Sequence, residues 1–166
     1  MENFKQTNLD DNILKAVTEM GFEKPTSVQA KTIPHLLNSN TDLIATAQTG
    51  TGKTAAFGLP SIHLTDLKNR DTSTLVLCPT RELCIQIAKD LTKYSKYVDG
   101  LNILAVYGGS DIRGQIKALN KGVHIVIGTP GRTKDLIKRN KLKIGSIARI
   151  VLDEADEMLT LSLIHI

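Results

Sequence analysis

The sequence predicts an α/β fold in which a mainly parallel sheet lies between two layers of helices. Short runs rich in apolar and β-branched residues recur along the 166 residues. Each run is almost continuously apolar, as expected of a strand that helices cover on both faces. Helical patterns, with apolar residues three or four positions apart, separate the runs. This alternation favours a three-layer α/β/α sandwich.

Five apolar runs predict the strands, and they cover residues 43–47, 75–78, 103–107, 124–127 and 150–153. Helical patterns precede or connect these runs, over residues 10–20, 27–38, 81–97 and 110–121. We therefore expect an N-terminal extension over residues 1–38 and one α/β domain over residues 39–160. In such a sheet, ligands bind outside the carboxyl ends of the strands.

The composition is that of a soluble globular protein, with 41% hydrophobic and 23% charged residues. A chain of this size buries roughly 70% of its unfolded surface, so a core can form without disulfides or a structural metal. The chain contains no run of about 18 apolar residues, and its first residues lack the order of a secretory signal. We expect a cytoplasmic protein that does not contact a membrane.

The two cysteines, Cys78 and Cys84, fall in a strand pattern and a helix pattern. Neither has another Cys or a His at the spacing of a metal site. The sequence therefore predicts buried free thiols.

Basic residues gather in the second half of the chain. Residues 84–166 carry 13 Lys and Arg against 8 Asp and Glu, and ten of those basic residues lie between Asp111 and Arg149. This excess fits a polyanionic partner. A solvated lysine-rich surface is the other interpretation, and charge alone does not decide between them.

A glycine-rich segment, AQTGTGKT, follows the first predicted strand and leads into a helical pattern. This is the context of a phosphate-binding loop, in which glycines turn the backbone so that successive N–H groups face phosphate oxygens. Lys53 would reach the β and γ phosphates, and Thr54 would offer a hydroxyl to Mg²⁺. The nucleotide-binding residues we expect are Ala47, Gln48, Thr49, Gly50, Thr51, Gly52, Lys53 and Thr54. A strand-to-helix turn without a ligand is the alternative.

Two carboxylates close the last predicted strand. Asp153 is placed to hold Mg²⁺, directly or through water, and Glu154 to orient or deprotonate an attacking water. We expect Lys53, Asp153 and Glu154 to be the catalytic residues. An acidic pair at the start of a helix has a structural alternative, because it also complements the helix dipole.

Residues 153–156 spell Asp-Glu-Ala-Asp, and with this string the chain resembles the DEAD-box ATP-dependent RNA helicases. The phosphate loop matches the variant of that family, in which Ala stands for the first Gly. Residues 21–29 resemble the family's adenine-reading Q motif, with Phe4 as its upstream aromatic. The resemblance extends from about Phe4 to Leu159. It implies the first RecA-like P-loop domain of a helicase core.

For the nucleotide, the resemblance implies ATP and Mg²⁺ as cofactors. Gln29 would read the edge of adenine, and Phe4 would stack on the ring. Gln29 has a structural alternative, because Thr26 and Gln29 have the spacing of a capping box at a helix start. Phe22 is expected to pack in the core.

Three further strings resemble the family's RNA-contacting motifs. They imply sequence-independent contacts to the RNA backbone, through hydroxyls, guanidinium groups and closely approaching glycines. The residues implied are Pro79, Thr80, Arg81, Gly108, Gly109, Thr129, Pro130, Gly131 and Arg132. Two of the strings also have a structural interpretation, since Thr129 before Pro130 is a good helix start and Pro79 is a normal strand end.

The resemblance also implies what a complete helicase needs beyond this chain. Asp156 would couple the nucleotide site to a Ser-Ala-Thr motif, which the sequence lacks, and a second RecA-like domain would supply the arginines that complete catalysis. We expect weak hydrolysis and no unwinding from these residues alone. A P-loop ATPase or GTPase of another class and a non-catalytic RNA-binding module are the alternatives.

The last six residues, Leu-Ser-Leu-Ile-His-Ile, equal one translation of a common transposon-end sequencing adapter. Our hypothesis is that residues 161–166 are not native to the gene, and we assign His165 no function. A natural divergent terminus is the alternative.

Overall fold

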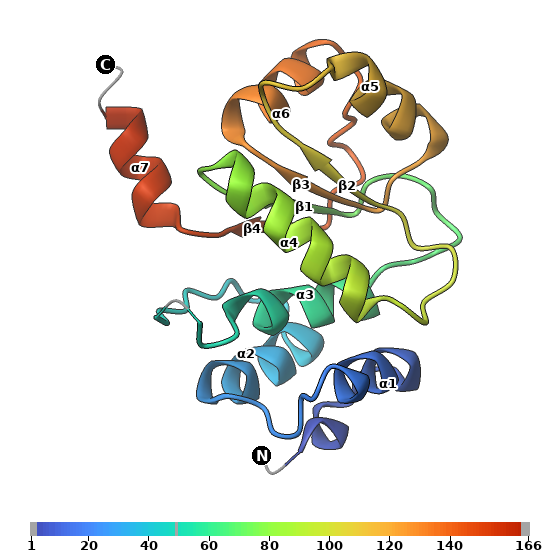
Figure 1. Cartoon of the computed structure of the whole chain (residues 1–166), viewed down its shortest axis with the longest axis vertical. Coiled ribbons are helices and arrows are strands. Elements are labelled where there is room, and N and C mark those ends of the chain that lie inside the picture. Colours follow the sequence, from blue (N-terminus) through green and yellow to red (C-terminus); the bar gives the residue numbers. More distant parts are fainter. Residues whose placement is uncertain (1–2, 49, 164–166) are drawn as a thin grey trace. The chain divides into compact units, whose positions relative to one another are not determined.

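The computed structural model describes residues 3–48 and 50–163, which form two compact units (Figure 1). The first unit comprises Met1–Thr65 and Asp90–Gly100, and the second comprises Asp66–Lys89 and Leu101–Ile166. The predicted boundary after residue 38 falls inside the first unit. The division into residues 1–38, 39–160 and 161–166 stays a prediction.

The second unit is built on a parallel sheet with the strand order β2-β3-β1-β4. Its strands are β1 (Thr74–Leu77), β2 (Ile103–Val106), β3 (Ile125–Gly128) and β4 (Arg149–Leu152). Thr74 of β1 pairs with Ile125 on one side and with Arg149 on the other. Four of the five predicted strands are therefore confirmed, within one residue at each end.

Helices cover both faces of this sheet (Figure 1). On one face, α5 (Ile112–Lys121) and α6 (Pro130–Lys138) enclose a core that includes Leu75, Val126 and Leu136. On the other face lies the start of α4 (Arg81–Tyr94), where the Cys84 thiol contacts the Ile127 carbonyl at 3.2 Å. The helix α7 (Ala155–Leu163) follows β4. The predicted three-layer α/β/α fold is confirmed.

The first unit, as far as it is described, is helical. It contains η1 (Phe4–Thr7), α1 (Asp11–Glu19), α2 (Ser27–Asn38) and α3 (Lys53–His63), together with the end of α4. Gly58 lets α3 approach α4 closely, because a Cβ there would lie 2.8 Å from Leu91. Among the described residues, no helix has the length and apolar content needed to cross a membrane.

The predicted strand over residues 43–47 is wrong, because these residues form a loop. Leu43 is 40% exposed and Ile44 is 94% exposed. A strand needs a neighbour for its N–H and C=O groups. All four strands of the described sheet belong to the second unit, so the first unit offers this run no partner.

Cys78 and Cys84 are buried free thiols, as predicted. Both are fully inaccessible to solvent. A hydrogen bond with the Cys84 thiol, together with burial, raises the pKa of the Cys78 thiol well above its usual value. Cys78 therefore stays a neutral thiol at physiological pH and serves as a packing residue.

Candidate functional site

The phosphate loop in the first unit is shaped by two glycines in the left-handed region. Gly50 has φ +80° and Gly52 has φ +85°, and α3 begins at the next residue, Lys53. The Thr51 hydroxyl donates a hydrogen bond of 2.7 Å to the Gln48 carbonyl and closes the turn. The predicted glycine turn at a helix start is confirmed. Thr49 lies outside the described residues.

Gln29 joins this loop to the start of α2. Its Oε1 accepts a hydrogen bond from the Thr26 N–H at 3.0 Å, and its Nε2 donates one to the Gly52 carbonyl at 3.1 Å. A Cβ on Gly52 would lie 2.2 Å from that Nε2, so only glycine fits there. The capping box, which was the alternative interpretation of Gln29, is confirmed.

The amide of Gln29 retains one N–H and one lone pair after these two bonds. However, Gln29 is only 3% exposed. A base could reach the remaining N–H and lone pair only if the surrounding backbone opened. Gln29 therefore has enough donors and acceptors to cap the helix and to bind adenine at once. Its burial allows the capping role in this structure but keeps a base from reaching the amide.

Phe4 differs from the expectation that its ring stacks on a base. The ring is 4% exposed, and its centroid lies 6.0 Å from that of Phe22, which lies 6.0 Å from Tyr94. Stacking requires an exposed ring face, and Phe4 has none because it fills the aromatic core of the first unit. The expectation is corrected: Phe4 and Phe22 are both packing residues.

Beside the phosphate loop, the first unit has a hollow of about 650 Å³. Its lining includes Thr26 and Lys31 near the start of α2, Ile44 in the loop before the glycines, and Ala47 and Thr51 of the phosphate loop. This volume is in the range of small-molecule and cofactor sites. The hollow therefore has room for the part of a nucleotide that lies beyond its phosphates.

In the second unit, the acidic pair closes β4 as predicted. Asp153 is buried, and its N–H donates to the Leu77 carbonyl at 2.9 Å, which fixes it to the end of β1. Glu154 has φ +54°, a conformation that costs a non-glycine residue on the order of 1–3 kcal/mol and that concentrates at functional sites. Asp156 and Glu157 occupy the first turn of α7. Asp156 and Glu157 therefore complement the helix dipole, which was the alternative role for Asp153 and Glu154.

The donor set suits Mg²⁺ bound together with phosphates. Among residues 3–48 and 50–163, no group of three or more His, Cys, Asp and Glu side chains is arranged to hold a metal. Mg²⁺ is usually held by one or two carboxylates, waters and substrate phosphates. Asp153 in the second unit offers one buried carboxylate and, separately, Thr54 in the first unit offers a hydroxyl; each is a donor of the kind that this mode uses.

The predicted RNA motifs of the second unit meet at the carboxyl ends of β1 and β2. The guanidinium carbon of Arg81, at the start of α4, lies 4.9 Å from the centre of the Tyr107 ring. Gly109 has φ +77°, and a Cβ there would lie 3.4 Å from the Arg81 guanidinium. Arg81 and Gly109, which are 28 positions apart, therefore form one exposed surface.

Arg132 connects the start of α6 to the same surface. Its guanidinium donates to the Gln115 Oε1 at 2.9 Å and to the Ser110 carbonyl at 3.2 Å. The Gln115 Nε2 in turn donates to the Ser110 hydroxyl at 2.7 Å and to the Tyr107 carbonyl at 3.2 Å. This network holds the loop that contains Gly108 and Gly109.

Neither Gln115 nor Tyr107 was predicted from the sequence. A signal for Gln115 was present, because it lies on the apolar face of α5 between Ile112 and Ile116, and it is 7% exposed. A polar side chain on the buried face of a helix needs hydrogen-bond partners. That requirement marks Gln115 as a positioning residue.

The remaining motif residues surround this surface. The Thr80 hydroxyl accepts a hydrogen bond from the Leu83 N–H at 3.2 Å, so it caps α4. Thr129 occupies the N-cap position of α6, yet its side chain makes no cap hydrogen bond, and Pro130 follows it in the first turn. Pro79 is half-buried, and Gly131 is exposed. The structural alternative is thus confirmed for Pro130 in the first turn of α6, whereas the cap formed by Thr80 was not predicted.

Comparison with known proteins gives a consistent result. The family model described as DEAD/DEAH box helicase matches residues 26–164. An "ATP-dependent RNA helicase CshA" from Listeria monocytogenes is 52% identical over 164 residues, which is 99% of this chain and 31% of that protein. An "ATP-dependent RNA helicase DeaD" from Klebsiella pneumoniae is 47% identical over 98% of this chain and 25% of its own length. The chain therefore spans a third or less of these relatives.

Solved structures agree. A DEAD box protein from Methanococcus jannaschii superposes with a TM-score of 0.92 and 47% identity, over 98% of this chain and 44% of its own. Dbp5 from S. cerevisiae, bound to RNA and ADP BeF3, superposes with a TM-score of 0.86 and 31% identity. That match covers 96% of this chain and 40% of the Dbp5 chain.

Proposed function

Because the chain belongs to the DEAD/DEAH box helicase family, we propose that it is the ATP-binding and RNA-binding first domain of an RNA helicase. The whole protein would couple ATP binding and hydrolysis to the remodelling of RNA duplexes. The observation that carries this proposal is the phosphate loop, with Gly50 and Gly52 in the left-handed region directly before α3. A P-loop enzyme of another class is not favoured, because the family model covers most of the chain.

ATP would bind with its phosphates on the loop and the start of α3, where backbone N–H groups and the helix dipole favour negative charge. Lys53 would neutralise the β and γ phosphates. Thr54 and Asp153 would be ligands of Mg²⁺, which withdraws charge from the phosphate oxygens when it is bound. Glu154 would orient the attacking water and take up its proton.

Adenine would be recognised by the remaining N–H and lone pair of Gln29, and because this amide is 3% exposed, the backbone around it would have to open for the base to bind. The bond from the Gln29 Nε2 to the Gly52 carbonyl supports a second consequence. Because the same amide contacts the phosphate loop, a base bound at Gln29 would also influence the position of Gly52. The Gln29 side chain would then link the selection of the base to the binding of the phosphates.

RNA would bind to the surface that Arg81, Gly109 and Arg132 form in the second unit. Charged donors and exposed glycine backbone suit the phosphates and sugars of a single strand, without selection of bases. Thr80 and Thr129 would contribute hydroxyls, while Pro79, Gly108, Pro130 and Gly131 would shape the backbone. The hydrogen-bond network of Gln115 supports this role, because it holds the glycine loop in place.

Efficient catalysis would require a second RecA-like domain in the same polypeptide. An arginine supplied from outside this domain is worth about 10³ to 10⁵ in rate in related phosphate-transfer enzymes. Asp156 would couple the nucleotide site to that domain. We therefore propose weak hydrolysis and no unwinding for the 166 residues, and a cytoplasmic location for the whole protein.

Nucleotide competition tests the proposal. Fluorescently labelled ATP bound to this chain should be displaced by unlabelled ATP at much lower concentration than by GTP. Gln29→Glu should reduce that preference, since it removes the amide donor. Equal displacement by ATP and GTP would contradict adenine recognition, and no displacement by either would contradict nucleotide binding.

A further inference from the structure

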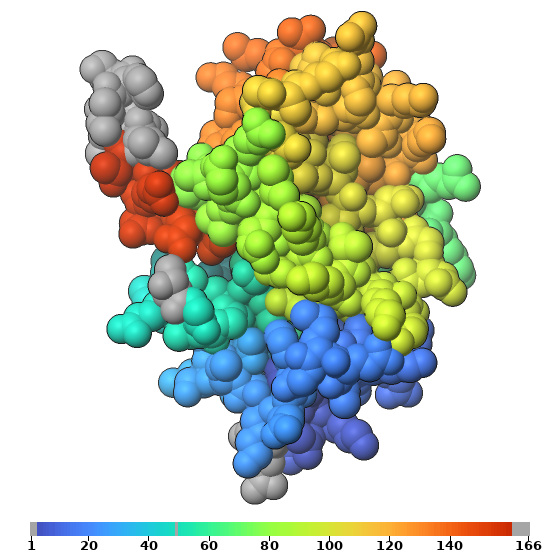
Figure 2. All heavy atoms as spheres, viewed as in Figure 1, coloured from blue at the N-terminus to red at the C-terminus, as the bar shows by residue number. Residues whose placement is uncertain are grey.

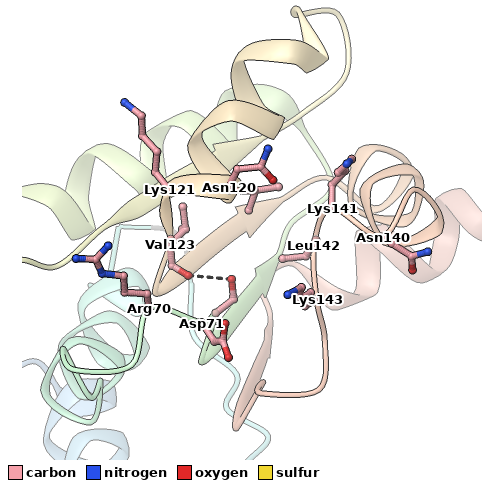
Figure 3. A pocket seen from close by; sticks show the side chains of 12 residues that line it. Arg70, Asp71, Asn120, Lys121, Val123, Asn140, Lys141, Leu142 and Lys143 are labelled. Carbon is pink, nitrogen blue, oxygen red and sulfur yellow. Dashed lines mark hydrogen bonds between the residues drawn. The ribbon is translucent and has the colours of Figure 1, made fainter.

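The second unit has a hollow of about 320 Å³ at the amino ends of its strands, opposite the edge that carries the RNA motifs (Figure 3). Three segments line it: the residues before β1, the residues between α5 and β3, and the loop after α6. Figure 2 shows α5 (gold) and the residues that follow it (orange) at the surface of this unit. None of the functions above uses this hollow.

The backbone around the hollow is held by contacts between distant segments. The Thr72 hydroxyl donates to the Val123 carbonyl at 2.9 Å, which is the dashed line in Figure 3. Gly122 has φ +97°, and a Cβ there would lie 2.9 Å from the Cβ of Arg70. Leu142, in the third segment, is 2% exposed and packs in the core of the sheet. The three segments therefore keep their relative positions.

The charge around the hollow is strongly positive. Arg70 and Lys121 lie on one side of it, and Lys141 and Lys143 lie on the other (Figure 3). Asp71 is the one carboxylate in the lining, and its Oδ2 accepts a hydrogen bond from the Ser146 hydroxyl at 3.1 Å. Within the described part of the chain, none of the four cationic side chains forms an ion pair.

Helix dipoles do not account for this arrangement. Lys121 is the last residue of α5, where a cation complements the negative end of the helix. Arg70, Lys141 and Lys143 lie outside the helices. Cations gathered around a concave surface raise the local concentration of anions. The arrangement therefore fits a ligand with several negative charges.

We propose that this hollow binds phosphates of the RNA backbone, as a second contact at the amino edge of the sheet. The proposal rests on the proposed RNA binding. It adds a second binding site, and it predicts that RNA affinity depends on the length of the strand. An oligonucleotide that covers only the carboxyl edge does not reach the hollow. A longer strand passes around the unit and contacts both edges. Three of the ten basic residues in the range 111–149, namely Lys121, Lys141 and Lys143, line the hollow and then have a specific use.

The test is the salt dependence of RNA binding to the 166-residue chain, measured by fluorescence anisotropy with oligonucleotides of about 6 and about 20 nucleotides. The variant is Lys141→Gln with Lys143→Gln, which leaves the buried Leu142 in place. For the long RNA, the slope of log K against log salt should fall by about 1.4, since each phosphate contact to a single strand contributes about 0.7. For the short RNA, affinity and slope should not change.

The matched control is Lys89→Gln with Lys117→Gln. It removes two charges from exposed positions on α4 and α5 that do not line the hollow. The control should leave both slopes near those of the wild type. An equal fall in the control would overturn the proposal in favour of a diffuse charge effect, and so would an unchanged slope in the hollow variant.

Two further outcomes separate this inference from the proposed function. If the short RNA binds and depends on Arg132 but the hollow variant behaves as wild type on long RNA, only the second contact is wrong. If the chain binds neither RNA, both proposals fail. Inorganic phosphate titrated alone, followed by NMR shifts of residues 141–143, tests a free anion as the ligand. Saturation by phosphate without any effect of the variant on RNA would overturn the RNA assignment.

Discussion

The phosphate loop of the first unit and the strand ends of the second unit hold the residues proposed to be functional in different ways. The phosphate loop depends on backbone shape, because Gly50 and Gly52 adopt positive φ and Gly52 lies directly against Gln29. The strand ends depend on side chains, because Arg132 and Gln115 position the neighbouring glycine loop through hydrogen bonds. Substitutions in the first region should therefore change the backbone, and substitutions in the second should change individual contacts.

Gly52→Ala should have the largest effect. A Cβ would lie 2.2 Å from the Gln29 Nε2, and φ +85° adds backbone strain, so the loop must move and the contact with Gln29 must break. We expect loss of ATP binding, measured with a fluorescent analogue, together with a lower free energy of unfolding in urea.

Gly50→Ala is the matched control for the same loop. Gly50 has φ +80°, but a Cβ there would meet nothing within 4 Å. Its cost should be limited to backbone strain of about 1–2 kcal/mol. If both variants lose stability equally, the contact between Gly52 and Gln29 is not what fixes the loop.

Lys53→Ala should abolish ATP hydrolysis by the protein extended with its second domain. The substitution removes the ammonium from the start of α3 and leaves the backbone donors of the loop in place. Steady-state phosphate release with saturating RNA measures the effect. Turnover close to that of the wild type would refute a phosphate-binding role for Lys53.

Glu154→Gln should slow hydrolysis by about 10² to 10⁴ and leave ATP binding nearly unchanged, because it removes a general base and keeps the shape. Glu154→Gly is a useful companion, because glycine adopts φ +54° without strain. It should lose hydrolysis equally while raising the free energy of unfolding. Loss of ATP binding in the Gln variant would instead assign Glu154 to the nucleotide or metal.

Arg132→Ala and Gln115→Ala should have the smallest effects. Together they distinguish a residue that contacts RNA directly from a residue that only positions the first. Arg132→Ala should lower the salt slope of RNA binding by about 0.7, as expected for one lost phosphate contact. Gln115→Ala removes the partner that orients Arg132, so affinity should fall while the slope stays constant. Identical slopes in Arg132→Ala and the wild type would mean that Arg132 acts only within the protein.

Much of the second unit could be predicted from sequence because its signals are local. The runs that became β1, β2, β3 and β4 are apolar and β-branched, and they pair with one another. The carboxyl ends of parallel strands share one edge, and ligands were expected to bind there. Arg81 and Gly109 meet at this edge.

The predictions that were wrong depend on contacts between distant residues, which a sequence alone does not show. Residues 43–47 have the composition of a strand, but strand formation depends on a neighbour with free backbone groups. Phe4 carries an aromatic ring that suits either a base or a core, and its contact with Phe22 decides for the core. Gln29 satisfied two motifs at once, and only the positions of Thr26 and Gly52 show how its amide is used.

The most direct test of the account is ATP hydrolysis by the protein extended with its second domain, measured with and without single-stranded RNA. We expect RNA to stimulate hydrolysis, and we expect Glu154→Gln to lower the stimulated rate by about 10² to 10⁴ while ATP still binds. Hydrolysis at the same rate with and without RNA would contradict the proposal that this chain carries both an ATP site and an RNA site.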